Sequence, residues 1–79
     1  MKLSVYSLKK VLFQGDASSL NCKTAVGEIT ILDNHQPLIG ILVEGVIKIV
    51  ADNKEQFFPV KSGFVEVKHG NEARVLVDE

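Results

Sequence analysis

Apolar and polar residues alternate along most of this chain, and that period of two is the feature that most constrains its fold. Successive side chains on a strand point to opposite faces, whereas a helix would repeat its pattern every three to four residues. No helical pattern persists for more than a turn, and turn-forming residues interrupt the alternation roughly every eight to twelve residues. The strands predicted in this way cover residues 3–6, 11–13, 18–24, 28–32, 38–43, 46–51, 56–60, 64–68 and 73–77.

Strands this short and this numerous indicate an all-β fold. The 79 residues form a single domain, 1–79, whose core must be compact because a chain of this size buries only about 60% of its unfolded surface. We predict a small β-sandwich or flattened barrel of about eight to ten short, mainly antiparallel strands. Pro59 is expected to confine its strand to an edge, since proline donates no ladder hydrogen bond, and Gly63 is expected to break the chain before the next strand.

Charge and hydropathy exclude several classes of function. Nine basic and ten acidic residues give a net charge of −1, and the basic residues are scattered, so nothing favours nucleic acid or an anionic membrane surface. No apolar stretch approaches the ~20 residues of a membrane span. The first residues alternate like a strand and lack the apolar core and cleavage site of a signal peptide. We therefore expect a soluble chain, or one that reaches a membrane only through partners.

The most distinctive stretch is a polar corner at residues 27–38. Gly27 permits a positive φ or a close approach, and Pro37 forces the preceding residue into extended geometry, which leaves His35 half exposed at the corner. His35 could be a metal ligand, an acid or base, a partner contact, or a corner histidine bonded to backbone. A metal site needs three or four ligands, and the chain has only one other histidine; a general base needs an orienting carboxylate, and Asp33 has the character of a turn residue.

Other residues give weaker signals for chemistry. Cys22 is the only cysteine, so no internal disulfide can form, and with only Lys23 beside it we expect a structural, inert thiol. Lys54 in the turn 52–54 raises an alternative function, a lipoyl- or biotinyl-type carrier domain modified at a hairpin tip. Nothing resembles a phosphate-binding loop or a nucleophile with its supporting base. No cofactor and no metal are expected.

The spacing of several separated blocks resembles one known family. The blocks are Leu12-Phe13-x-Gly15, the pattern Gly27-Glu28-Ile29-x-Ile31 with His35-x-Pro37-Leu38, then Gly45-x-Ile47-x-Ile49, and finally Gly63-Phe64-Val65-Glu66-Val67. Together they resemble the N-terminal β-sandwich of the F-type ATP synthase epsilon subunit, called delta in mitochondria. The sequence departs from the family at Leu32-Asp33-Asn34 and Ser62-Gly63, although Asn34 can adopt the left-handed geometry of a glycine. Many members continue into a two-helix C-terminal hairpin, and this chain ends before it, either as part of a longer subunit or as a naturally short one.

The resemblance implies a role without catalysis. It predicts a rotor component in the central stalk of a proton- or sodium-translocating ATP synthase, bound peripherally at the cytoplasmic face of the membrane and linking the gamma subunit to the c-ring. Carried over by position, the c-ring contact falls on Lys23, Ala25, Glu28 and Thr30. The gamma contact falls on Ser7, His35, Pro37, Leu38 and Gly40. Glu28 is the preferred c-ring residue, because an exposed carboxylate can pair with a basic residue of a c-ring loop.

Overall fold

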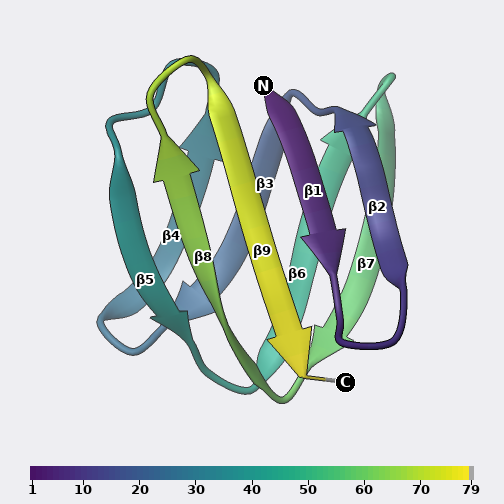
Figure 1. The fold of residues 1–79 in the computed structure, drawn as a ribbon, viewed down its shortest axis with the longest axis vertical. Helices are drawn as coiled ribbons and strands as arrows, with labels where there is room; N and C mark the ends of the chain where they lie inside the picture. The colour runs from purple at the N-terminus through teal and green to yellow at the C-terminus, as the bar shows by residue number, and fades with distance from the viewer. Residues whose placement is uncertain (79) are drawn as a thin grey trace.

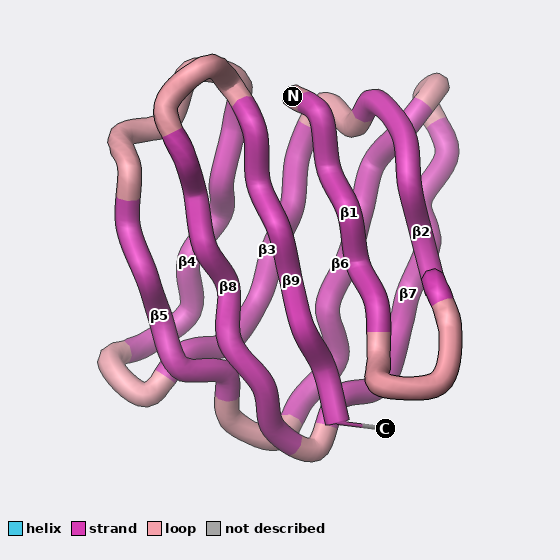
Figure 2. Tube along the Cα trace, in the orientation of Figure 1, coloured by secondary structure: helices cyan, strands magenta, loops and turns pink. Residues whose placement is uncertain are grey.

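A computed structural model describes residues 1–78 and contains no helix within them. The elements are β1 (Lys2–Tyr6), β2 (Val11–Asp16), β3 (Ser19–Thr24), β4 (Gly27–Leu32), β5 (Leu38–Leu42), β6 (Gly45–Ala51), β7 (Lys54–Val60), β8 (Ser62–Lys68) and β9 (Glu72–Asp78). This order confirms the all-β prediction, and every predicted strand is present. Figure 2 shows the strands joined by short loops.

The strands form two facing layers. The front sheet has the order β2-β1-β9-β8-β5, and the back sheet has the order β4-β3-β6-β7 (Figure 1). Neighbouring strands are antiparallel, except that β1 runs parallel to β9. A single backbone pairing, Thr24 with Leu42, joins the two sheets through β3 and β5. The predicted sandwich of mainly antiparallel strands is therefore confirmed, and β7 with Pro59 lies at an edge as expected.

The core lies between the sheets and is built from alternate residues of nearly every strand. Leu3 and Val5 on β1 are fully buried, and the predicted inward residues of β6 are buried too, with Ile47 2% and Ile49 0% exposed. Because side chains on a strand alternate between faces, each strand that fills the core also presents a second set of side chains outward. Those outward sets are the surfaces on which a partner can bind.

The connections lie at two opposite ends of the sandwich. The N-terminal end, at the top of Figure 1, holds Met1 and the turns at 17–18, 33–37, 52–53 and 69–71. The C-terminal end, at the bottom, holds the turns at 7–10, 25–26, 43–44 and 61. Asn34 has a φ of 61°, so the turn that departs from the resembled family keeps the left-handed residue that glycine would otherwise supply.

Gly63 does not break the chain, and that part of the prediction is wrong. It lies inside β8, paired with Leu42 on one side and Val77 on the other. Its φ is +154°, and a Cβ placed there would come within 2.1 Å of the Leu76 carbonyl oxygen and 3.0 Å of the Val77 Cα. The glycine is therefore required because two backbones approach more closely than any side chain allows.

A clamp formed by the N-terminus joins three connections at the N-terminal end. The buried Met1 ammonium donates to the Ala17 carbonyl at 2.7 Å and to the Asp33 carboxylate, with Asp16 at 3.3 Å. Asn71 continues the network, since its side-chain amide donates to Asp33 at 3.4 Å and its Oδ1 accepts the Asn34 backbone N–H at 2.7 Å. The clamp therefore fixes the turn that carries His35.

Replacing Gly63 tests the close approach between β8 and β9. We expect Gly63→Ala to lower the free energy of unfolding by about 3 kcal/mol, because the methyl group meets backbone rather than a side chain that can move. Gly40→Ala is the matched control, since the atoms nearest to its Cβ would belong to side chains: the Val65 Cγ1 at 3.4 Å, the Thr24 Cγ2 at 3.5 Å and the Leu38 Cδ1 at 3.9 Å. Urea unfolding of both variants measures the difference; equal losses would contradict the assigned role of Gly63.

The clamp predicts a characteristic dependence of stability on pH. The hydrogen bond to Asp33 raises the pKa of the Met1 ammonium, and the same bond lowers the pKa of Asp33. The ammonium therefore contributes fully below its unfolded pKa of about 8, and its contribution disappears as pH rises through the higher folded value. The contribution of Asp33 is complete above its unfolded pKa of about 4 and is lost as pH falls through the lower folded value.

Asp33→Asn removes the charge and should lower the urea midpoint near neutral pH and flatten the alkaline decline. The matched control is Asp52→Asn, which removes an exposed carboxylate from a turn whose positive φ of 53° suits asparagine as well. The urea midpoints of wild type and both variants are measured from pH 3 to pH 10, at intervals of about one pH unit, and compared. Parallel curves for wild type and Asp33→Asn would rule out the clamp as a source of stability.

Candidate interaction surfaces

The four residues expected at the c-ring lie on or beside the β3–β4 hairpin. Lys23 and Glu28 are directly opposite each other across the two strands, and Ala25 lies in the turn between them. The Thr24 hydroxyl donates to the Gly27 carbonyl at 2.7 Å and accepts the Val26 N–H at 3.3 Å, so the turn is held from within. All four expected residues are exposed: Lys23, Ala25, Glu28 and Thr30. The structure brings the first three together near the C-terminal end.

Glu28 is available for a partner. Among residues 1–78 no ion pair involves its carboxylate, although Lys23 stands opposite. Thr30, further along β4, instead accepts a hydrogen bond from the Asn21 amide at 2.9 Å. The tip of the hairpin adds an apolar group, because Val26 is 95% exposed. The surface therefore combines a free carboxylate with one exposed apolar side chain.

The residues expected at the gamma subunit do not form one surface. His35 and Pro37 lie in the β4–β5 connection at the N-terminal end, and Leu38 begins β5 directly after them. The Nδ1 atom of the His35 ring is 2.7 Å from the Gln36 carbonyl oxygen, and the backbone N–H of His35 donates to the Leu32 carbonyl oxygen. One of the interpretations considered from the sequence was a corner histidine bonded to backbone in this way. These three residues therefore lie together at one corner of the sandwich.

Ser7 lies away from that corner, in the β1–β2 turn at the C-terminal end (Figure 1). It is only 9% exposed, and its hydroxyl accepts the backbone N–H groups of Lys9 at 3.2 Å and Lys10 at 3.3 Å. The structure thus places Ser7 within the turn rather than on its surface. Gly40 is half buried in the middle of β5, where its backbone pairs with Val65.

An apolar row on the front sheet was missed by sequence reasoning. Cross-strand pairing places Ile41 beside Phe64, Phe64 beside Leu76, and Leu76 beside Tyr6, which in turn pairs with Val11. These outward side chains form the apolar row: Ile41, Phe64, Leu76, Tyr6 and Val11. Three of them are substantially exposed, Ile41 at 67%, Phe64 at 45% and Val11 at 59%. No pattern within a single strand reveals the row, because it depends on which strands are neighbours.

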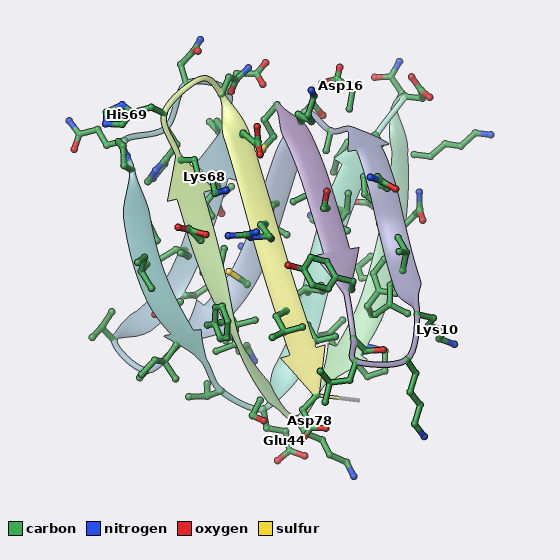
Figure 3. All side chains as sticks on the ribbon, in the orientation of Figure 1. Lys10, Asp16, Glu44, Lys68, His69 and Asp78 are labelled. Carbon is green, nitrogen blue, oxygen red and sulfur yellow. The ribbon has the colours of Figure 1, made fainter. Side chains whose placement is uncertain are left out.

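Polarity increases across the same face toward the N-terminal end. The adjacent row pairs Glu66 with Arg74, whose guanidinium donates to the carboxylate at 2.6 Å, and this bond lowers the pKa of Glu66 and raises that of Arg74. Lys68 and His69 lie at the far end, and Asp16 ends the edge strand there (Figure 3). The front sheet therefore offers one apolar band bounded on one side by charged residues.

The structure places the candidate nucleophile in the core and the candidate carrier lysine at the start of a strand. Burial raises the pKa of the Cys22 thiol to about 11, so the sulfur stays protonated at neutral pH. Asp52 and Asn53, with φ values of 53° and 62°, form the whole β6–β7 turn. Lys54 is the first residue of β7, so the prediction of a lysine at the hairpin tip is wrong by one position.

Two further features bear on function. In residues 1–78 no group of three or more histidine, cysteine, aspartate or glutamate side chains is placed to hold a metal ion. Over the same described residues, no helix is long and apolar enough to cross a membrane.

Comparison with known proteins places this chain in a family. The family described as "ATP synthase, Delta/Epsilon chain, beta-sandwich domain" matches residues 1–79. An ATP synthase epsilon chain of Leptospira interrogans is 37% identical over 78 residues, which are 99% of this chain and 61% of the relative. One from Shouchella clausii is 35% identical over 86% of this chain and 51% of the relative. The chain thus spans about half to three fifths of the length of these curated relatives.

Solved structures share the fold. The chain matches part of the Euglena gracilis mitochondrial ATP synthase, described as OSCP/F1/c-ring, with a TM-score of 0.93 and 17% identity over 100% of this chain and 51% of the other. It also matches the Tetrahymena thermophila mitochondrial ATP synthase central stalk/c-ring, with a TM-score of 0.84 and 21% identity over 99% and 63% of the two chains. With the family match across all 79 residues, the chain belongs to the β-sandwich domain family of ATP synthase delta and epsilon chains.

Proposed function

We propose that this domain is a non-catalytic rotor component that links the gamma subunit to the c-ring of an ion-translocating ATP synthase. The observation that carries the proposal is the family match over the whole chain, joined by solved relatives described as central stalk and c-ring. In this role the domain acts peripherally at the cytoplasmic face of the membrane, and the coupled ion is a proton or a sodium ion. Torque passes through it by contact alone.

The two-sheet core suits transmission of torque. Close-packed side chains between two sheets resist deformation. A force applied at one surface is therefore transmitted to another, because no flexible hinge between them absorbs it. The apolar row on the front sheet and the β3–β4 hairpin are two surfaces of this one rigid unit, and they adjoin where the Ala25 N–H donates to the Ile41 carbonyl at 2.9 Å. Two partners can therefore bind it at the same time.

The gamma subunit is proposed to cover the apolar row and to extend toward the corner of His35, Pro37 and Leu38. An exposed band with an aromatic side chain near its centre is the usual composition of an interface core, and charged residues beside it form a rim. Phe64 occupies that position, with Ile41 and Leu76 on either side. Ser7 contributes by shaping its turn, and Gly40 lies in the middle of β5, where its backbone pairs with Val65 of β8.

The c-ring is proposed to meet the C-terminal end through Glu28, with Lys23, Ala25 and Thr30 around it. Glu28 has no ionic partner among residues 1–78, and its strand lies at the edge of the back sheet. A basic residue on a polar loop of the ring would pair with it. Such a partly desolvated pair fixes register between two surfaces more than it adds affinity.

Substitution of Phe64 tests the gamma surface. We expect Phe64→Ser to weaken binding to the gamma subunit from the same source by about 10- to 30-fold, as for a central aromatic anchor. Phe57→Ser is the matched control, because Phe57 is 57% exposed and lies on the back sheet. Isothermal titration measures both affinities. An equal effect of the two substitutions would show that the apolar row is not the binding surface.

Charge reversal at Glu28 tests the c-ring surface. In the assembled complex, Glu28→Arg should reduce ATP-driven ion pumping while leaving the melting temperature of the domain unchanged, since the carboxylate is exposed and unpaired within residues 1–78. Glu55→Arg on β7 is the control, because it makes the same charge reversal at a residue that forms an exposed ion pair with Lys48. It should lower the free energy of unfolding by no more than about 1 kcal/mol and leave pumping unchanged. Normal pumping by the Glu28 variant would remove this contact from the proposal.

A further inference from the structure

The α-amino group of Met1 is surrounded by oxygen atoms at the N-terminal end of the sandwich. It donates to the Ala17 carbonyl at 2.7 Å and to the Asp33 carboxylate, and the Asp16 carboxylate lies at 3.3 Å. Met1 itself is only 4% exposed. Asp16 marks this end of the sandwich in Figure 3. The site therefore suits a small cation with several N–H donors, which an unmodified ammonium supplies.

The backbone next to this nitrogen is held by hydrogen bonds to two other connections. The Met1 carbonyl accepts the Ala17 N–H at 2.9 Å, and the Lys2 N–H donates to the Asn71 carbonyl at 2.9 Å. Lys2 is also the first residue of β1, where it pairs with both β2 and β9. The position of the nitrogen is thus set by strand pairing, and any group attached to the nitrogen must be accommodated where the nitrogen lies.

Acylation would change the charge, the donors and the size of this group. A formyl or acetyl group turns the ammonium into an amide, which is uncharged and carries a single N–H. One N–H cannot serve the Ala17 carbonyl and both carboxylates, so Asp16 and Asp33 would be left without their shared cation. The acyl group would also need space beside a residue that is almost completely buried.

We propose that the α-amino group of Met1 is a modification-sensitive site, at which N-acylation opens the clamp and releases the turn that carries His35. Asn71 connects the site to the turn, because its amide donates to Asp33 and its Oδ1 accepts the Asn34 N–H at 2.7 Å. The proposal concerns maturation of the chain, and it holds whichever partner the domain binds.

The burial of Met1 also sets the order of processing and folding. Where translation starts with N-formylmethionine, removal of the formyl group is a hydrolysis: water adds, the formamide C–N bond breaks, formate leaves, and the amine takes up a proton. Because Met1 is buried once the sheets have closed, this step precedes folding. The folded chain in turn protects its amine from later acetylation.

Comparison of free, formylated and acetylated chains provides the test. The formylated chain is expressed with peptide deformylase inhibited, the acetylated chain with an N-terminal acetyltransferase, and mass spectrometry verifies each product. We expect either acyl group to lower the folding equilibrium constant, from urea unfolding at neutral pH, by about tenfold, because charge-assisted hydrogen bonds are lost.

Asp33→Asn separates the lost charge pair from the added bulk. This substitution should lower the folding equilibrium constant of the free chain by about threefold or more and leave that of the acylated chains within about twofold. Asp52→Asn is the matched control, since it removes an exposed carboxylate from a turn outside the clamp. Its effect should be the same with and without the acyl group.

Hydrogen exchange of single amides gives a local readout. The Asn34 N–H should exchange about tenfold faster in the acylated chains, because the network that holds it is opened. The Ala25 N–H is the control, since it donates to the Ile41 carbonyl at 2.9 Å at the opposite end of the sandwich and should keep its rate.

Three results would overturn the proposal: equal unfolding curves for free and acylated chains, an unchanged exchange rate of the Asn34 N–H, and additive effects of acylation and Asp33→Asn, which would assign the loss to bulk alone. If acylated wild type does not fold, the acylated Asp33→Asn chain decides. Folding of that chain supports the proposal, and failure of both chains to fold overturns it.

Discussion

Close packing of two sheets around one apolar layer is the constraint on which the other properties of this domain depend. Each strand gives alternate side chains to that layer and is then left with a second set that faces outward. Leu3 and Val5 fill the core, whereas Tyr6 continues the same strand into the apolar row. The outward-facing surfaces are thus a by-product of the packing that stabilises the fold, and their rigidity has the same origin.

The fold brings distant segments together, and this explains why the surfaces of the structure differ from the groups of residues expected from the sequence. His35, Pro37 and Leu38 are neighbours in sequence and stay together, while Ser7 lies at the opposite end of the sandwich. The apolar row instead collects one side chain from each of five strands, which come from both ends and the middle of the chain. Under the proposed function a partner would recognise the strand order rather than a motif, and substitutions at the row would act through the partner more than through stability.

Alternation and turn chemistry made the strands predictable, because both are local properties of the chain. The inward positions Ile47 and Ile49 and the left-handed Asn34 followed from them. Gly63 was misread because a glycine that ends a strand and one that admits a neighbouring backbone look alike in sequence, and only the position of Leu76 distinguishes them. The residues of the β3–β4 hairpin were named as c-ring contacts by resemblance and stay a prediction, whereas the apolar row required the order of the strands.

The parallel pairing of β1 with β9 has a consequence for synthesis in the cell. Lys2 pairs with Glu72, and Tyr6 pairs with Leu76, so the front sheet cannot close until nearly the last residues of the domain have been made. Pairings of such long sequence separation fold slowly. A nascent or truncated chain without β9 therefore lacks Leu76, the middle residue of the apolar row. A partner that selects this row would assemble only with complete copies of the domain. Docking would in this way serve as a check on the completeness of the fold.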